Sequence, residues 1–192
     1  MFSVIEYIKG RLSDIKEGLA VLEIGGIGLA VRVSAHTSDL LPALGEEVFL
    51  YIYTEIREND ISLYGFADEA ERIAFFDLIS VNGVGPKMAL NILSKFEYGE
   101  LYTYISSKNT AALESISGVG KKTAMRIVTE LEDRAKQRLR INATADRDVS
   151  EDAIAALVGL GYTRIEAAGA VGRVSGSSVE SALMEALKIL GR

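Results

Sequence analysis

The sequence predicts a multidomain α+β protein with a small N-terminal β-barrel, a central all-α domain and a C-terminal three-helix unit. Three observations predict this arrangement. Residues 1–66 contain five short runs rich in Val, Ile and Tyr. Residues 67–142 carry helical patterns around a seven-residue motif that occurs twice, and a polar stretch at 143–150 precedes a last helical segment at 151–192. A chain of 192 residues has room for one to three small domains.

The N-terminal segment is predicted to form strands because its apolar runs are short and β-branched, and turn residues separate them. Gly25-Gly26 is typical of a hairpin, and residues 14–18 and Asn59-Asp60 are typical of turns. Five strands within about 65 residues fit an OB-fold barrel, and periodicity alone does not separate this from an SH3-like barrel. The predicted strands are 5–9, 19–24, 29–33, 48–56 and 61–64.

The central segment is predicted to be all-α and internally duplicated, with two copies of a helix, a hairpin and a second helix. The first helix places Ile73, Phe76 and Ile79 on one face, and Pro86 suits the first turn of the next. The predicted helices are 69–79, 86–96, 98–107, 110–116 and 121–138.

Residues 143–150 are polar and lack periodicity, which predicts an irregular linker with a mean span of roughly 17 Å. Beyond it, three short helices are predicted at 151–159, 163–173 and 179–190. A unit of about forty residues is close to the lower limit for independent folding, so a compact three-helix domain is expected.

Composition excludes several classes of site. The absence of cysteine excludes disulfides and thiolate metal sites, and a single histidine, His36, argues against a histidine metal site or a catalytic triad. No apolar stretch approaches the length of a membrane span, and the N-terminus lacks the pattern of a signal peptide. We therefore expect no metal site, no membrane association and a cytoplasmic location.

The net charge of −6 is unevenly distributed. Residues 1–66 carry 5 basic and 10 acidic side chains, whereas residues 67–142 carry 11 basic and 10 acidic ones. The final residues, 143–192, carry 5 and 7. The relatively basic central segment holds both copies of the repeated motif, and a local cationic face can bind phosphate despite an acidic whole chain.

The repeated motif reads Val-Asn-Gly-Val-Gly-Pro-Lys at 81–87 and Ile-Ser-Gly-Val-Gly-Lys-Lys at 116–122, 35 residues later. Each copy opens a predicted helix, where free backbone N–H groups and the helix dipole favour an anion. Glycine permits positive φ and close approach of a ligand, and the adjacent lysines add charge. One copy could be an ordinary turn, but two lysine-flanked copies favour two phosphate sites.

Nucleotide binding is not expected at these motifs. A P-loop requires Gly-x-x-x-x-Gly-Lys-Ser/Thr after a strand. Here Ser115 stands where the first glycine would be, Lys122 occupies the Ser/Thr position, and a helix precedes the loop.

The doubled motif resembles a pair of helix-hairpin-helix motifs, and the whole chain resembles the RuvA family of Holliday-junction-binding proteins. Any one of the matching motifs is weakly specific, but their order along essentially all 192 residues is highly specific. The motifs are Leu63-Tyr64-Gly65-Phe66, Asn82-Gly83-Val84-Gly85-Pro86-Lys87, Gly120-Lys121-Lys122-Thr123-Ala124 and Leu160-Gly161-Tyr162.

The resemblance implies a non-catalytic DNA-binding subunit that acts in recombination and repair. Proteins of this family form four-fold tetramers, single or paired, that hold a four-way junction open on a basic face. The matching positions imply DNA contacts from Asn82, Gly83, Val84, Gly85, Lys87, Gly118, Val119, Gly120, Lys121, Lys122 and Arg126.

The family also carries an acidic pin on the barrel at the centre of the tetramer. Glu58 matches the first pin carboxylate, Asn59 stands at the second acidic position, and Asp60 is displaced by one. Four copies of Glu58 near the axis would repel phosphates and help to separate strands at the crossover. Without the resemblance, this loop would be interpreted as an ordinary solvated turn.

The last segment resembles the family's third domain, a ubiquitin-associated-like (UBA-like) unit that binds the hexameric RuvB ATPase. The resemblance implies that ATP is used by that motor and that this chain holds no cofactor, and it admits a RuvC-type resolvase as a further partner. The linker is short for the family. Apolar residues that could contact the motor or fill the unit's own core are Leu157, Leu160, Tyr162, Leu183 and Leu187.

Two other functions fit the sequence less well. A helix-hairpin-helix glycosylase carries a catalytic Asp about twenty residues after the hairpin lysine, yet Asp133 follows Lys121 by only 12 residues and Ser107 stands at that distance from Lys87. A single-strand-binding barrel would need exposed aromatic and basic residues, whereas residues 1–66 have a net charge of −5.

Overall fold

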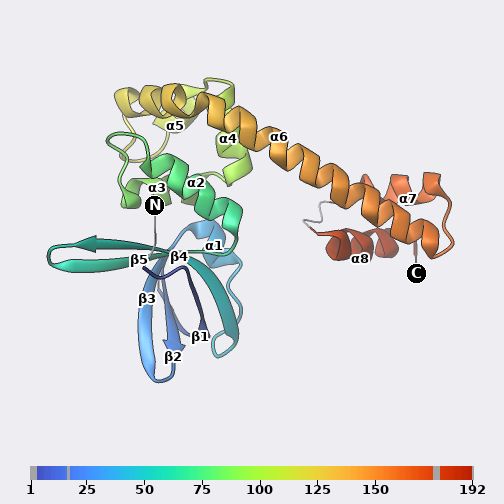
Figure 1. Cartoon of the computed structure of the whole chain (residues 1–192), viewed down its shortest axis with the longest axis horizontal. Helices are drawn as coiled ribbons and strands as arrows, with labels where there is room; N and C mark the ends of the chain where they lie inside the picture. The colour runs from blue at the N-terminus through green and yellow to red at the C-terminus, as the bar shows by residue number, and fades with distance from the viewer. Residues whose placement is uncertain (1–3, 17, 175–177, 192) are drawn as a thin grey trace. The chain divides into compact units, whose positions relative to one another are not determined.

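The computed structural model describes residues 4–16, 18–174 and 178–191, and the side chains of these except at 142–148. The chain falls into two compact units, Met1–Lys136 and Gln137–Arg192. The first unit contains a β-barrel and a set of helices (Figure 1). Part of the predicted turn at 14–18, Glu17, lies outside the described residues.

The N-terminal strands close into a barrel in the order β1-β2-β3-β5-β4, with β3 parallel to β5 and the other pairs antiparallel. This strand order confirms the OB-fold class and excludes the SH3-like alternative. β1 begins at Tyr7 rather than residue 5 and is longer than predicted, because Leu12 continues past residue 9 the inward alternation that Ile8 begins. The strands are β1 (Tyr7–Lys16), β2 (Leu19–Ile24), β3 (Ile27–Val33), β4 (Glu47–Arg57) and β5 (Asp60–Phe66).

The β4 and β5 strands extend beyond the barrel as a two-stranded ribbon (Figure 1). Where the ribbon leaves the barrel, Tyr53 and Tyr64 join Phe75 in a cluster of buried rings, with centroids 5.2 and 5.6 Å from that of Phe75. Burial and the neighbouring carboxylate of Glu55 raise the pKa of Tyr64 to about 12. This aromatic cluster fixes the base of the ribbon against the helices.

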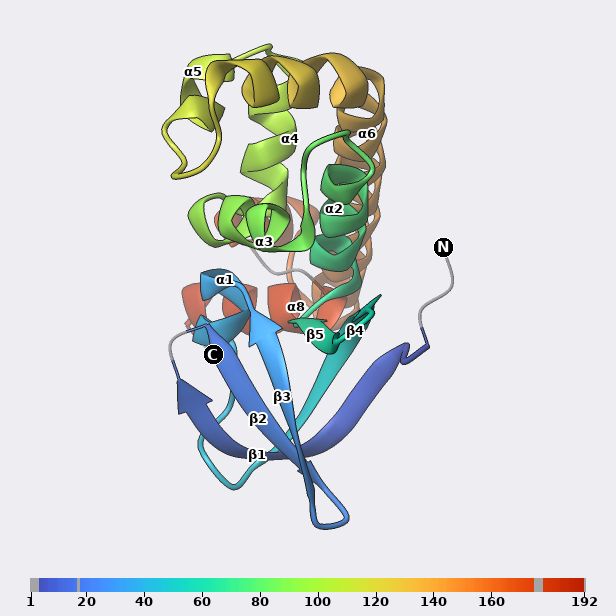
Figure 2. The same ribbon diagram turned by 90° about the vertical axis from the view of Figure 1, so that its left-hand side faces the viewer.

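A short helix that the sequence did not predict, α1 (Ala35–Asp39), lies across one end of the barrel beside α3 (Pro86–Lys95) (Figure 2). Ser34 caps α1 by accepting from the N–H of Thr37. Helix α1 is only five residues long, too short for a periodic signal to reveal it in sequence.

A buried polar cluster joins this end of the barrel to α2 (Glu69–Ile79). The hydroxyls of Ser34 and Thr37 both donate to the carboxylate of Glu71, and Thr37 accepts in turn from the N–H of Ala67. Glu71 is 1% exposed, and burial raises its pKa although the two hydroxyl donors oppose the shift. The cluster therefore makes the barrel and the helices one packed body.

Five helices surround the repeated motif, and their starts agree with the predicted ones. The core face of α2 differs from the prediction: Ala74, Phe75 and Leu78 are fully buried, whereas Ile73, Phe76 and Ile79 are only half-buried. The remaining helices of this group are α3, α4 (Tyr98–Ser106), α5 (Thr110–Glu114) and α6 (Lys121–Gly159).

The predicted irregular linker at 143–150 is wrong, because α6 is one helix of 39 residues that runs through it. Polar character alone does not break a helix. No glycine or proline occurs from residue 121 to residue 158, and α6 ends at the first glycine it meets, Gly159. The helix predicted separately at 151–159 is the last part of α6.

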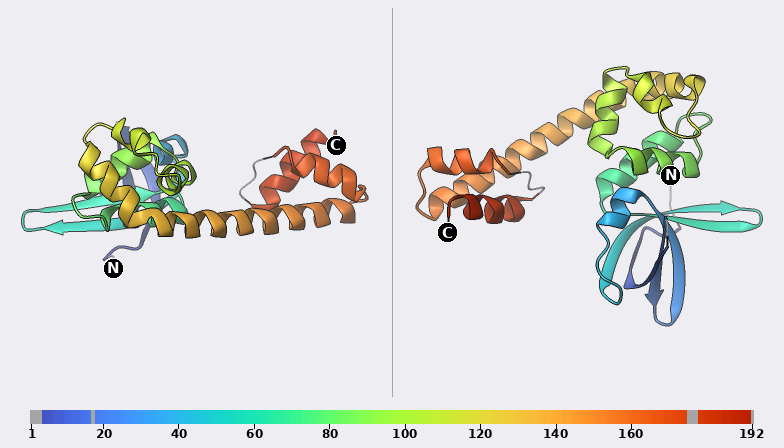
Figure 3. Two further views of the ribbon diagram at one scale, coloured as in Figure 1. Left: turned by 90° about the horizontal axis from the view of Figure 1, so that it is seen from above. Right: turned by 180° about the vertical axis from the view of Figure 1, so that it is seen from behind.

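In the second unit, α7 (Arg164–Val171) and α8 (Val179–Ile189) pack with the C-terminal part of α6 (Figure 3). Small alanines and Leu157 form the centre of this unit. Thr163 caps α7 in a reciprocal capping box with Glu166, which explains why α7 begins there. The predicted three-helix domain is confirmed, with its first helix continuous with the preceding domain.

Candidate nucleic-acid interface

The two copies of the repeated motif have the same backbone conformation. Gly83 has φ +89° and Gly118 has φ +90°, a region that side-chain-bearing residues rarely adopt. The burial pattern of 81–85 and 116–120 is also identical: buried, exposed, exposed, buried, exposed. The duplication in sequence is therefore a duplication in structure, and we call these segments the first and second hairpins.

A valine anchors each hairpin to the helical core. Val84 is 5% exposed and Val119 is 4% exposed. Their N–H groups donate to the carbonyls of Val81 and Ile116, both at 3.0 Å. Because each turn is closed by the same bond and sealed by the same side chain, the glycines on either side face outward.

Each hairpin ends at the start of a helix with free backbone donors. The carbonyl of Gly85 accepts from Ala89 and that of Gly120 from Ala124, both at 2.9 Å, so these two glycines stand at the N-cap. The next three residues of each helix have no intrahelical acceptor for their N–H groups, although Pro86 has no N–H to offer. No side chain caps α3. Both helix starts can therefore accept an anion.

Gly85 and Gly120 are not required by the fold. A Cβ added at either would meet no atom within 4 Å, and neither has positive φ. Other residues could therefore occupy both positions without strain in the chain itself. Open space beside an N-cap lets a bulky anion approach the backbone closely. The approach of a ligand therefore explains why glycine occupies these two positions, whereas packing within the chain does not.

Lysines flank both helix starts. Lys87, Lys121 and Lys122 are exposed and form no ion pair with any residue that the structure describes. On α6, a hollow of 590 Å³ beside the second hairpin is lined by Lys121, Lys122, Met125, Arg126, Thr129 and Glu130. The cationic side chains available to a polyanion therefore lie next to the free N–H groups.

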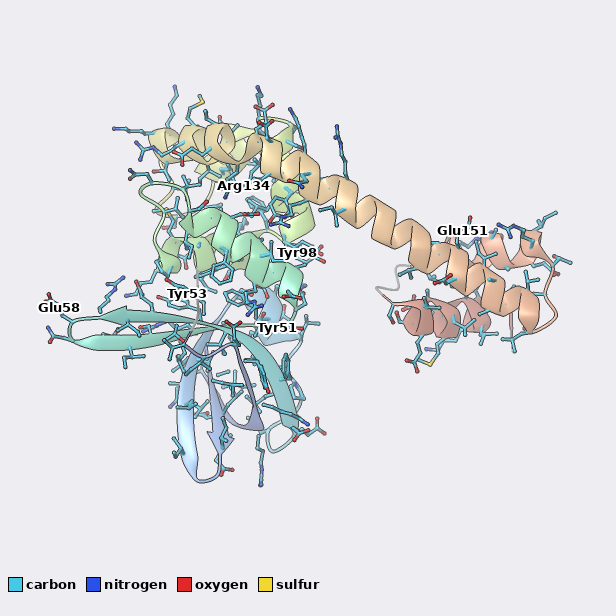
Figure 4. The ribbon with its side chains drawn as sticks, viewed as in Figure 1. Tyr51, Tyr53, Glu58, Tyr98, Arg134 and Glu151 are labelled. Atoms are coloured by element: carbon cyan, nitrogen blue, oxygen red, sulfur yellow. The ribbon has the colours of Figure 1, made fainter. Side chains whose placement is uncertain are left out.

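Two arginines of α6 contact the first hairpin region. Arg126, predicted to contact DNA, donates from Nη1 to the carbonyl of Asn82 at 2.7 Å. Arg134, labelled in Figure 4, donates from Nη1 to the hydroxyl of Ser80 at 2.9 Å, and the same nitrogen lies 3.5 Å from the carboxylate of Asp77. Sequence reasoning missed both links, because nothing in the spacing shows that α6 reaches back across the first hairpin.

The residues predicted for the pin form the tip of the ribbon (Figure 4). Arg57 pairs with Asp60 across the ribbon, so Glu58 and Asn59 form the turn. The carboxylate of Asp60 accepts from Ser62 at 2.8 Å. Within the described part of the chain, Glu58 makes no hydrogen bond or ion pair, so its carboxylate is the freely solvated one at the tip.

The five predicted motor-contact residues differ in exposure. Leu157 is fully buried in the core of the second unit, the second of the two roles expected for these residues, and presents no surface to a partner. Leu160 is 58% exposed. Tyr162, Leu183 and Leu187 are partly buried against the same core.

The described residues contain no group of three or more His, Asp or Glu side chains placed to hold a metal ion. A search of the same residues found no helix with the length and apolar character to cross a membrane.

The closed barrel, the paired hairpins and their free lysines define a DNA-binding protein of the helix-hairpin-helix class. Comparison with family models gives a match over each part of the chain. Residues 5–65 match "RuvA N terminal domain", 75–133 match "SAM-like Helix-hairpin-helix tandem" and 148–191 match "RuvA, C-terminal domain". The chain belongs to the RuvA family.

Curated relatives match the chain in sequence over almost their whole length. A protein of Thermoanaerobacter sp. (strain X514) is 38% identical over 187 residues, covering 97% of this chain and 99% of the relative. One of Desulforudis audaxviator is 35% identical over 200 residues, covering 98% and 99%. One of Pseudomonas aeruginosa is 38% identical over 199 residues, covering 96% and 98%. Each is named "Holliday junction branch migration complex subunit RuvA".

Proposed function

We propose that this protein binds four-way DNA junctions as the non-catalytic subunit of a branch-migration complex. The observation that carries the proposal is the pair of equivalent hairpins, each with a left-handed glycine, free N–H groups and exposed lysines. Such groups contact phosphates and sugars rather than base edges, so recognition depends on DNA shape and not on sequence. The names of the relatives support a junction as the shape recognised.

Each hairpin would hold one phosphate of a duplex arm. The contacts would come from Asn82 to Lys87 in the first hairpin and from Gly118 to Lys122 in the second. In a single four-fold tetramer, the eight hairpins would provide two contacts for each arm of the junction, and a second tetramer on the opposite face would double that number. Exposed lysines make this binding depend steeply on salt, because each neutralised phosphate releases counterions.

The ribbon would supply the acidic pin of this assembly. Glu58 is its free carboxylate, Asn59 adds none, and Asp60 is held by Ser62. Glu58 of four subunits at the crossover would repel the phosphates that meet there and so favour an open junction. This chain would therefore have a weaker pin than one with two free carboxylates at the tip.

The second unit would recruit a RuvB-type hexameric ATPase, which uses ATP to move the duplex arms; a RuvC-type resolvase is a further partner of the assembled junction. Leu160 is the most exposed of the expected contact residues. Leu160→Asp should leave junction binding intact and reduce motor-driven branch migration. The matched control is Met184→Asp, since Met184 has similar exposure, 56%, on α8. Full branch migration with Leu160→Asp would contradict the assignment.

Junction binding is tested by gel shift with a four-way junction and purified full-length protein. The double variant Lys121→Glu, Lys122→Glu should bind the junction much more weakly at moderate salt. A chain that lacks residues 150–192 should bind the junction but fail to support the motor. Unchanged affinity of the lysine variant would refute the hairpin sites. Full motor activity of the shortened chain would refute the role of the second unit.

A further inference from the structure

Arg126 connects the two hairpins. It lies in the second turn of α6, just after the second hairpin, but its guanidinium reaches the first. Its Nη1 donates to the carbonyl of Asn82 at 2.7 Å, and a Cβ added to Gly83 would lie 3.4 Å from the same nitrogen. The carboxylate of Glu130, one turn further along α6, lies 3.8 Å from Nε.

This contact joins segments that are otherwise anchored separately. Val84 fixes the first hairpin and Val119 the second, each through a hydrogen bond within its own turn. The exposed rims, where phosphates would bind, are linked by Arg126 across 44 residues of sequence. Two phosphate sites contribute their full binding free energy to one DNA backbone only if the distance between them is already fixed in the free protein, because ordering the sites on binding costs free energy.

We propose that Arg126 is a positioning residue: it locks the first hairpin to the helix of the second, so that the two phosphate sites bind DNA as one preorganised unit. The proposal rests on the proposed function for its ligand. It assigns the side-chain contacts with phosphate to Lys87, Lys121 and Lys122, which are exposed and not engaged in ion pairs with described residues.

The chemistry of the side chain fits this role better than that of a phosphate ligand. The guanidinium of Arg126 already donates to the carbonyl of Asn82, and the carboxylate of Glu130 lies beside it. The negative charge of that carboxylate weakens the attraction of the guanidinium for a phosphate. A lysine would keep the charge but lose the planar fork and the reach that this bond uses. Arg126→Lys removes the positioning contact but keeps the positive charge, whereas Arg126→Gln removes both. Comparing the two variants therefore distinguishes a positioning role from a direct charge contribution to DNA binding.

The first test needs no DNA. Hydrogen exchange is measured at the Val84 N–H, which closes the first hairpin, in the wild type, Arg126→Gln and Arg126→Lys. Both variants should speed exchange at Val84 by at least about threefold, the change expected when one hydrogen bond is removed. The matched amide in the second hairpin, that of Val119, and the barrel amide of Leu50 should not change. Equal rates at Val84 in all three proteins would overturn the proposal, and a parallel rise at Leu50 would show general destabilisation and overturn it too.

The second test measures coupling between the hairpins on a four-way junction. Junction affinity is compared for Lys87→Ala, Lys122→Ala and their double variant, in the wild-type and Arg126→Lys backgrounds. With Arg126 the two substitutions should be non-additive, and with lysine at that position they should become additive. Lys136→Ala removes one positive charge elsewhere on α6 and should leave the coupling unchanged.

Failure of this inference differs from failure of the proposed function. If Arg126→Lys binds the junction like the wild type while Arg126→Gln loses affinity and lowers the salt dependence, Arg126 is a phosphate ligand and the inference is overturned. If the wild type itself does not bind junctions, the proposed function fails. The exchange experiment on the free protein still decides whether Arg126 holds the first hairpin.

Discussion

Gly85 and Gly120 give the sharpest test of how the hairpins work. The double substitution Gly85→Ala, Gly120→Ala adds one methyl group to each N-cap. In the free protein this methyl meets open space, and the backbone there needs no positive φ. We therefore expect the variant to fold normally but to bind DNA poorly, because the methyl occupies the place of the approaching phosphate.

The expected stability change is small because two effects oppose each other. Alanine is a poorer N-cap residue than glycine by roughly 0.5–1 kcal/mol. Removal of a glycine also lowers the entropy of the unfolded chain, which stabilises by about 0.4–1 kcal/mol. The free energy of unfolding should thus change by less than about 1 kcal/mol in total, as measured by urea denaturation.

The expected binding change is large by comparison. A charge-assisted hydrogen bond from a backbone N–H to a phosphate is worth about 1.5–3 kcal/mol, so the loss of one such bond lowers affinity at least about tenfold. The assay is a gel shift with a four-way junction at fixed moderate salt. Junction affinity equal to that of the wild type would refute the claim that phosphates approach these two glycines.

Gly83 and Gly118 supply the matched control with the opposite expectation. Their φ values of +89° and +90° place an alanine in strained backbone, at a cost of roughly 1–2 kcal/mol for each. Gly83→Ala, Gly118→Ala should therefore lower the free energy of unfolding clearly, whereas the N-cap pair should not. Equal destabilisation by the two double variants would contradict this division of roles.

Three further outcomes are expected. Replacing Lys121 and Lys122 by alanine should reduce the slope of log affinity against log salt by about 0.9 for each phosphate that is no longer neutralised, and an unchanged slope in a salt titration would argue against direct binding by these lysines. Burial raises the pKa of Glu71, so the folded state binds the proton of this carboxyl more tightly than the unfolded state does. Relative to Glu71→Gln, the free energy of unfolding of the wild type should therefore increase as pH falls from 7 toward 4, and urea denaturation that shows no such increase would refute this. At low salt, Glu58→Gln should strengthen junction binding about twofold and Asn59→Asp should weaken it, and both effects should shrink at high salt. Equal affinities of the two variants and the wild type at low salt would contradict the role of the ribbon tip as an acidic pin.

The fold was predictable where local signals are strong. Alternating β-branched residues predicted the strands, and helix starts at Glu69, Pro86 and Lys121 followed from caps and turns. Tertiary contacts decided the rest. The closed strand order needed the pairing of β3 with β5, and the polar cluster around Glu71 joins residues that are 34 and 37 positions apart.

The candidate site was predictable in part for the same reason. The glycines and lysines of the hairpins are contiguous in sequence, so their chemistry could be inferred from the motif. The hydrogen bond from Arg126 to Asn82 joins residues 44 positions apart, and no pattern in the sequence predicts it. Leu157 and Leu160 could not be told apart from the sequence, but Leu157 lies within α6 and is buried, whereas Leu160 follows the end of that helix and is exposed. Polarity at 143–150 predicted a linker, although the lack of glycine and proline allowed the helix to continue.

Preference for a four-way junction over duplex DNA is the central claim, and a competition gel shift measures it most directly. Full-length protein is bound to a labelled junction at moderate salt and challenged with unlabelled junction or with unlabelled linear duplex of the same sequence. The junction should displace the label at a concentration at least about tenfold lower than the duplex, a difference of roughly 1.4 kcal/mol. Equal competition by the two DNAs would contradict recognition of the crossover.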